Sequence, residues 1–181
     1  MFYMFLADGF EETEALATLD VLRRAEIDVK TVGVTGNTVV GSHKIPVIAD
    51  VSIEDVNFDN IDGVVLPGGM PGTTNLQNNK KVLDCVMSAY NGNKPVCAIC
   101  AAPSVLGSLG ILNGKIATCF PGFEDKLLGA NVSNVGVVAD GNVVTAKGAG
   151  VSLEFGFKIA ELLKGKDVAD KLRDIMQCNS L

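Results

Sequence analysis

Cys100 is the residue whose place in the sequence best suits it for chemistry. The segment before it, residues 95–99, is mostly apolar and is typical of a short buried strand. The segment after it reads Ala-Ala-Pro-Ser and predicts the first turn of a helix, where proline is tolerated because its missing N–H would have no partner. The pattern therefore places Cys100 on a sharp strand-to-helix turn between small side chains, as in a nucleophile elbow with Cys in place of Ser.

A thiol on such a turn faces unpaired N–H groups and the positive end of the helix dipole. Both features favour the thiolate, so we predict that Cys100 is reactive. The alternative is an inert buried thiol, because free cysteines are among the most buried residues in proteins.

Glu14 is the candidate partner of Cys100. It lies one turn into a predicted helix that follows another strand. A carboxyl packed against sulfur in an apolar niche tends to be protonated, because desolvation disfavours its charge, and it can then donate a hydrogen bond or relay a proton. The alternative is that Glu11, Glu12 and Glu14 only complement the positive N-terminus of the helix.

Backbone N–H groups can complete the same site. Gly68 and Gly69 follow a predicted strand, and their N–H groups together with that of Ala101 would form an oxyanion-type pocket. The alternative is an ordinary turn at the end of a strand, because two adjacent glycines are common in turns.

The other chemically suggestive residues have weaker patterns. Cys97 and Cys100 match the C-x-x-C redox motif, but residues three apart on a strand point to opposite faces, so we expect the two sulfurs to diverge. His43 is the only histidine and lies in an early hairpin, where we expect it to be exposed or at an interface. The spacing indicates neither a metal-ligand cluster nor a nucleotide-binding glycine loop.

The elements around these residues predict an α/β fold. Apolar segments alternate with helical patterns, which indicates a mostly parallel sheet covered on both faces. The expected strands are residues 2–7, 29–34, 61–66, 95–100 and 115–119, with hairpins at 36–49 and 135–146. The expected longer helices are residues 11–25, 75–90, 152–163 and 166–176. The loops expected to meet on one rim are residues 8–14, 67–72, 100–103, 119–122 and 148–150.

Length and composition exclude several classes of protein. We expect residues 1–181 to form one domain, and the net charge of −6 gives no basic surface for nucleic acid. No apolar run approaches the length of a membrane span, and the N-terminus lacks the basic leader of a signal peptide. Five cysteines without framework spacing indicate free thiols in a reducing compartment, so we expect a cytoplasmic protein.

Four motifs, spread in order along nearly the whole chain, resemble those of the DJ-1/ThiJ/PfpI family, in its YajL-like branch. They are the helix entry at 6–14, the glycine loop at 64–69, the cysteine elbow at 98–103, and the glycine turn at 147–150 with Glu154 and Phe155 after it. The resemblance implies a flavodoxin-like three-layer sandwich that forms a homodimer and uses no metal or organic cofactor.

The resemblance also implies roles for single residues. Cys100 would be the nucleophile, Glu14 its protonated partner, and Gly69 and Ala101 backbone donors to the oxygen that the sulfur attacks or carries. Gly68 is a secondary candidate beside them.

Two further candidates depend on the same resemblance. Cys119 would be a second thiol on the rim, and the hairpin around His43 would lie at the dimer interface, which would bring His43 towards the neighbouring site. The sequence also departs from some relatives, because residues 117–121 contain no histidine and Ala101 stands where the peptidase-like branch has one. We therefore do not expect peptidase activity.

The resemblance implies two classes of function. One is a glyoxalase or deglycase that converts methylglyoxal, glyoxal or their adducts to hydroxy acids without a cofactor. The other is a redox sensor or chaperone-like stress protein that signals by oxidation of Cys100, and a third association is thiazole biosynthesis. The sequence leaves open whether there is turnover, because the first two classes need the same thiolate pocket.

Overall fold

The computed structural model describes residues 1–57 and 60–178. Its centre is a sheet with the strand order β10-β11-β7-β6-β1-β2-β5, in which only β10 and β11 pair antiparallel. The strands, in sheet order, are β10 (Val137–Asp140), β11 (Val143–Ala146), β7 (Val96–Ile99), β6 (Gly63–Leu66), β1 (Phe2–Leu6), β2 (Val29–Gly33) and β5 (Val51–Ser52). The predicted, mostly parallel α/β sheet is therefore confirmed.

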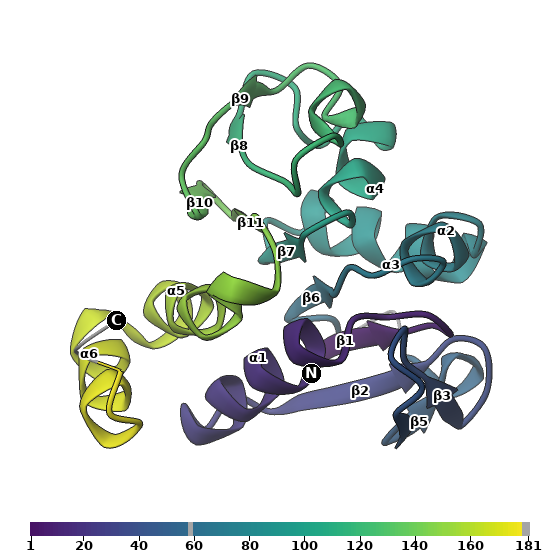
Figure 1. The fold of residues 1–181 in the computed structure, drawn as a ribbon, viewed down its shortest axis with the longest axis horizontal. Helices are drawn as coiled ribbons and strands as arrows, with labels where there is room; N and C mark the ends of the chain where they lie inside the picture. The colour runs from purple at the N-terminus through teal and green to yellow at the C-terminus, as the bar shows by residue number, and fades with distance from the viewer. Residues whose placement is uncertain (58–59, 179–181) are drawn as a thin grey trace.

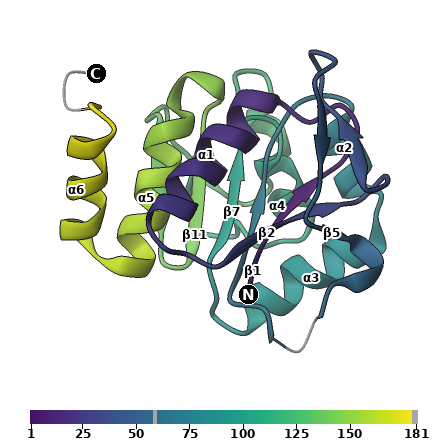
Figure 2. The same ribbon diagram turned by 90° about the horizontal axis from the view of Figure 1, so that it is seen from below.

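Helices cover both faces of this sheet (Figure 1). One face carries α1 (Glu12–Arg24) and α5 (Ser152–Lys164), with α6 (Lys166–Ile175) packed outside α5. The other face carries α2 (Gly72–Gln77), α3 (Lys80–Asn91) and α4 (Pro103–Ser108). Figure 2 shows α1 and α5 side by side across the strands. The result is the predicted flavodoxin-like three-layer sandwich.

Strand β1 shows why its sequence is apolar throughout. Phe2, Met4 and Leu6 pack into the cluster under α1 and α5, whereas Tyr3 and Phe5 pack into the cluster under α3 and α4. Successive side chains of a strand point to opposite faces, so a strand covered on both faces needs apolar residues at every position.

Two small sheets lie outside the central one. The antiparallel hairpin predicted at 36–49 is confirmed as β3 (Thr38–Val40) paired with β4 (Pro46–Ile48). The pair β8 (Ile116–Ala117) and β9 (Asn131–Val132) is parallel. Short 3-10 turns complete the described elements at η1 (Ile53–Asp55), η3 (Glu124–Lys126) and η4 (Ala149–Val151).

Three details of the predicted elements are wrong. The single helix expected at 75–90 is two helices, because the Asn79 side chain caps a new helix by accepting from the N–H of Val82. The strand expected at 115–119 is reduced to β8, which pairs outside the central sheet. The short edge strand β5 was not expected.

The rim predicted at the carboxyl ends of the strands is present. The loops after β1, β6, β7 and β11 leave the parallel strands at the same edge. The loop after β8 joins them, because the N–H of Phe120 donates to the carbonyl of Cys100 at 2.8 Å. Among the described helices, none combines the length and the apolar character that a membrane crossing requires.

Candidate active site

Cys100 occupies a strained turn between β7 and α4. Its φ is 65°, in the left-handed region that residues other than glycine seldom adopt. Its N–H donates to the carbonyl of Ala146 at 2.9 Å, which fixes the turn against the end of β11. Pro103 is the first residue of α4, and the Cys100 side chain is half-buried and forms no disulfide. The predicted strand-to-helix turn is confirmed.

Glu14 lies beside Cys100 at the start of α1. The residue is only 1% exposed, and its N–H is capped by Oε2 of Glu11 at 2.6 Å. Its own Oε2 accepts from the N–H of Gly68 at 2.9 Å, and the N–H of Ala149 and the side chain of Cys100 are close enough to lower the pKa of its carboxyl. Glu14 is therefore part of the same site as Cys100, rather than a surface acid at a helix N-terminus.

Gly68 separates these two side chains and has to be glycine. A Cβ added there would lie 2.6 Å from the Cβ of Cys100 and 2.7 Å from Oε2 of Glu14. Real Cβ atoms essentially never approach other atoms so closely. Gly68 was predicted only as a secondary site residue, but its missing side chain is what allows Glu14 and Cys100 to meet.

Gly69 and Ala101 provide the two predicted N–H groups. Both groups are close enough to the Cys100 sulfur to favour its charged form. Gly69 has a φ of 87°, and a side chain there would clash with the backbone of Gly9 and Phe10. The structure thus brings together the four residues that the sequence analysis singled out first.

The electrostatics of the pair agree with the prediction for Glu14, whose pKa is raised by burial, and differ from it for Cys100. Burial raises the pKa of Glu14 to about 7, although hydrogen bonds from Cys100, Gly68 and Ala149 oppose the shift. Burial and the neighbouring Glu14 carboxylate raise the pKa of the Cys100 thiol to about 12, although the N–H groups of Gly69 and Ala101 oppose this shift. The N–H groups therefore favour the thiolate as predicted, but burial and the like charge of Glu14 outweigh them, so the pKa of Cys100 is raised and not lowered.

The proton shared by the two residues decides which one is charged. A neutral Glu14 no longer repels the sulfur, and its O–H can donate a hydrogen bond to it. Two groups this close titrate as a pair, so the thiolate exists in the molecules in which Glu14 holds the proton.

The two cysteines nearest to this pair along the fold, Cys97 and Cys119, are buried. Cys119 is 3% exposed and packs into the cluster under α3 and α4, whereas Cys100 packs against the cluster on the opposite face. The thiol of Cys119 is therefore not presented on the rim as expected. Cys97 is fully buried in the cluster that Cys100 contacts, so the two do not diverge to opposite faces; the left-handed turn ends the strand alternation at Cys100.

His43 lies on the loop of the β3–β4 hairpin, with its side chain 70% exposed as expected. Its Nδ1 lies 2.9 Å from Oε2 of Glu12 and 3.8 Å from Oε1 of Glu11. These three side chains bring possible metal-ligand atoms within 4.8 Å of one another, a grouping that the sequence spacing did not reveal. The oxygens of Glu12 are already occupied by hydrogen bonds from the protein.

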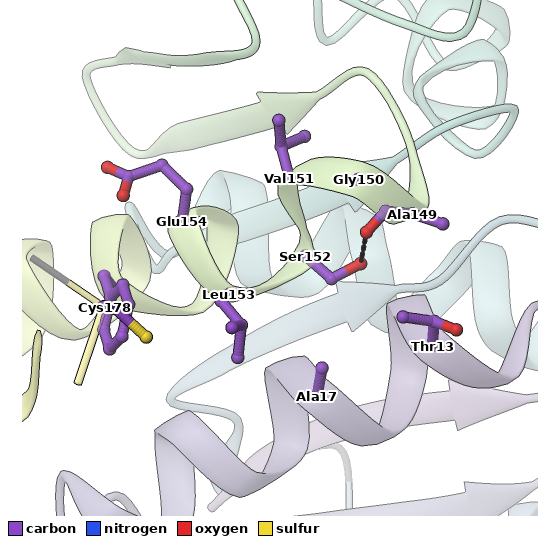
Figure 3. Close-up of a pocket in the computed structure, with 10 residues that line it drawn as sticks. Thr13, Ala17, Ala149, Gly150, Val151, Ser152, Leu153, Glu154 and Cys178 are labelled. Atoms are coloured by element: carbon purple, nitrogen blue, oxygen red, sulfur yellow. Dashed lines mark hydrogen bonds between the residues drawn. The ribbon is translucent and has the colours of Figure 1, made fainter. Parts of the chain in front are cut away.

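Two hollows adjoin the site. One, of about 390 Å³, is lined by Phe120, Pro121 and residues 147–151. A Cβ on Gly148 would lie 3.3 Å from the Phe120 ring and 3.8 Å from Oε1 of Glu14, so this hollow adjoins the buried carboxyl. The other, of about 540 Å³, lies between α1 and the start of α5, where Ser152 donates to the carbonyl of Ala149 (Figure 3).

Together, the sheet and the site define a class of flavodoxin-like proteins with a cysteine on a strand-to-helix turn and a buried carboxyl beside it. The sequence profile of the DJ-1/PfpI family matches residues 2–162, so the chain belongs to that family.

Relatives along the whole chain agree with this assignment. The chain is 40% identical over 167 residues to Protein dj-1beta of Drosophila melanogaster, covering 91% of this chain and 89% of that protein. It is 32% identical over 160 residues to a protein of Pyrococcus abyssi that is named a deglycase, covering 87% and 96% of the two chains. The solved structure of Toxoplasma gondii DJ-1, oxidized, aligns with a TM-score of 0.93 at 30% identity, covering 97% of each chain.

Proposed function

We propose that the protein converts 2-oxoaldehydes such as methylglyoxal and glyoxal, or their adducts, to hydroxy acids, with Cys100 as nucleophile and no cofactor. The observation that carries this proposal is that Glu14 and Cys100 meet at Gly68, where an added Cβ would lie 2.6 Å from the Cβ of Cys100 and 2.7 Å from Oε2 of Glu14, beside the N–H groups of Gly69 and Ala101. The deglycase name of the Pyrococcus abyssi relative supports the same chemistry.

The first step is attack of the Cys100 thiolate on the aldehyde carbon. The carbonyl oxygen becomes an oxyanion, which the N–H groups of Gly69 and Ala101 are placed to stabilise, and protonation gives a hemithioacetal. Glu14 supplies that proton and becomes the base for the next step.

The second step moves a hydrogen within the substrate. Glu14 removes the proton from the former aldehyde carbon while the oxygen of the second carbonyl takes up a proton, which gives an enediol. Glu14 then returns its proton to the adjacent carbon while the hydroxyl on the former aldehyde carbon gives up its own, so the second carbonyl becomes an alcohol and the hemithioacetal becomes a thioester. Water then hydrolyses the thioester, releases the hydroxy acid and restores the thiol. One water is consumed, and no external oxidant or reductant is required.

The test is turnover of methylglyoxal to lactate by the purified protein without glutathione. We expect Cys100→Ser to abolish lactate formation and Glu14→Gln to reduce it by about a hundredfold or more, the usual range for loss of a general acid–base. Cys178→Ser is the matched control, because Cys178 is also half-buried and free but lies outside the pair. Equal lactate formation by wild type and Cys100→Ser would contradict the proposal.

A second candidate is a redox sensor that signals by oxidation of Cys100. Oxygens added to the sulfur would meet the same N–H groups of Gly69 and Ala101, and the relative from Toxoplasma gondii was solved in an oxidized form. Absence of turnover together with ready oxidation of Cys100 would favour this function.

We further propose that the protein is a homodimer in a reducing compartment such as the cytoplasm. Exposed apolar side chains on α1 and the β3–β4 hairpin support a subunit interface there: Leu16, Val40, Ile45 and Ile48. Sedimentation at micromolar concentration tests the oligomeric state, and a monomer would contradict the proposed homodimer.

Five free cysteines support the proposed reducing compartment.

A further inference from the structure

Glu12 carries a buried carboxylate that the proposed reaction does not use. Its side chain is 6% exposed, although it belongs to the first turn of a surface helix. Burying an ionised carboxylate is costly unless hydrogen bonds replace the lost water. Its partners therefore indicate what this residue does.

Those partners all come from the loop of the β3–β4 hairpin. Oε1 of Glu12 accepts from the N–H of His43 at 2.7 Å and from the N–H of Ile45 at 3.4 Å. Oε2 accepts from the Ser42 hydroxyl at 3.3 Å and lies 2.9 Å from Nδ1 of His43. A side chain on Gly41 would clash with the carboxylate, so the loop is shaped around it.

The same loop is bonded to the turn that joins β1 to α1. The N–H of Gly9 donates to the carbonyl of Val40, and the N–H of Ser42 donates to the carbonyl of Phe10, both at 2.8 Å. The N–H of Val40 also donates to Oδ1 of Asp8 at 2.8 Å. Glu12 therefore binds the loop of the β3–β4 hairpin, and the hairpin is hydrogen-bonded to residues 8–10.

Residues 9–11 form the support of Gly69. The N–H of Glu11 donates to the carbonyl of Gly68 at 2.9 Å, and the Gly69 Cα packs directly on the backbone of Gly9, Phe10 and Glu11. Any displacement of this turn therefore moves the N–H of Gly69 and the start of the helix that carries Glu14.

We propose that Glu12 is a positioning residue for the Cys100 site, acting through the hairpin loop and the turn at 9–11 on Gly69 and Glu14. It does not touch the sulfur. Its carboxylate binds the loop of residues 41–45 and keeps this loop packed on the turn at 9–11. The turn then keeps the Gly69 N–H and the Glu14 carboxyl in position beside Cys100.

The charge of Glu12 suits this role. Burial opposes ionisation, but hydrogen bonds from the His43 side chain and from the N–H groups of His43 and Ile45 lower the pKa of Glu12 to about 2. The carboxylate therefore remains ionised at every pH at which the protein would work. The described groups that face His43 are Glu12 and Glu11, and both favour its protonated form.

The test compares Glu12→Ala with Glu12→Gln, using iodoacetamide alkylation of Cys100 between pH 5 and 10 as the readout. In this range the Cys100–Glu14 pair loses its first proton, because the pKa of Glu14 is about 7 and the two groups titrate as a pair. Glu12→Ala should raise the pH midpoint of alkylation and slow the reaction at pH 7 by about tenfold, as expected when a hydrogen bond to a charged sulfur is weakened. Glu12→Gln keeps an oxygen for the two N–H groups and an amide for Ser42 and His43, so it should remain within about twofold of wild type.

Asp50→Ala is the matched control. The Asp50 carboxylate also joins distant segments, by accepting from the N–H of Thr31 at 2.8 Å, from its hydroxyl at 2.9 Å and from Arg23 at 2.6 Å. It does not bond the turn at 9–11, so its loss should lower the melting temperature without changing the alkylation midpoint.

Two results would overturn the proposal. One is a Glu12→Ala midpoint equal to that of wild type, with only a lower melting temperature; the other is an equal shift in Glu12→Ala and Glu12→Gln. Should Glu12→Ala fail to fold, His43→Ala removes one exposed partner of the carboxylate and should shift the midpoint in the same direction by a smaller amount. No shift in His43→Ala would then overturn the proposal. Alkylation does not require turnover, so these results are independent of the proposed reaction.

Discussion

The N–H of Gly68 donates to Oε2 of Glu14 at 2.9 Å, and the missing Gly68 side chain leaves the space in which Glu14 meets Cys100. Gly68 therefore has two roles in the site: its N–H donates a hydrogen bond to Glu14, and its lack of a side chain leaves space for Glu14 to approach Cys100. This explains why a buried carboxyl and a thiol from different elements can share a proton.

Gly68→Ala should break this relationship. The new Cβ would overlap Cys100 and Glu14, so one of them must shift, and overpacking of this kind costs roughly 1–3 kcal/mol. We expect alkylation of Cys100 at pH 7 to slow by about tenfold because the pair is disrupted. Gly150→Ala is the control, because a Cβ there meets no atom within 4 Å. Equal effects of the two substitutions would show that Gly68 has no special role.

Glu14→Gln should make the protein more stable in mildly alkaline solution. Burial raises the pKa of Glu14 from its usual 4.5 to about 7, so the folded state keeps a proton that the unfolded chain loses. The free energy of unfolding therefore falls as pH rises from about 4.5 to about 7, by an amount on the order of 3 kcal/mol. Glutamine has no such titration, so the gain should appear at pH 8 and be small at pH 4, as measured by thermal unfolding. A gain of equal size at both pH values would contradict this account.

His43 should contribute stability in acidic solution. Its hydrogen bond and charge interaction with Glu12 raise its pKa in the folded state. The contribution is therefore fully present below the unfolded-state pKa of about 6.5 and is lost as pH rises through the higher folded-state value. His43→Gln should remove this dependence, which unfolding in urea at pH 5.5 and pH 9 would measure. A constant difference between variant and wild type across this range would show that the ring charge has no effect on stability.

Mild hydrogen peroxide should add two oxygen atoms to Cys100. The first product, a sulfenic acid, condenses with a thiol only where one is accessible. Cys97 is 0% exposed and Cys119 is 3% exposed, so neither neighbouring thiol is accessible for this reaction. Further peroxide therefore converts the sulfenic acid to a sulfinic acid, whose oxygens would meet the N–H groups of Gly69 and Ala101. Intact-mass spectra at graded peroxide concentrations measure this. A loss of two hydrogens, from a disulfide between Cys100 and Cys119, would contradict the prediction.

The sequence predicted those parts of the site that depend on local pattern. An apolar strand followed by small residues and proline was enough to place Cys100 on its turn, and the rule for parallel sheets placed Glu14 and Gly69 on the same rim. The role of Glu12 was not predictable in this way, because its partners lie 30–33 residues along the chain. The raised pKa of Cys100 was missed for a similar reason, since burial and the approach of Glu14 are produced only by tertiary packing.

The left-handed backbone at Cys100 affects whether catalytic activity can be inferred from family membership in proteins with this fold. A φ of 65° disfavours every side chain by roughly 1–2 kcal/mol relative to glycine. Replacing Cys100 with glycine, which exchanges the whole CH2–SH side chain for a hydrogen atom, would therefore relieve this backbone strain. Homologues could therefore lose the nucleophilic thiol by substitution and still keep the same fold, with an equal or higher melting temperature. Homology and a superimposable backbone do not by themselves show that a protein of this fold is active. The residue at the position of Cys100 must be a cysteine for the proposed chemistry.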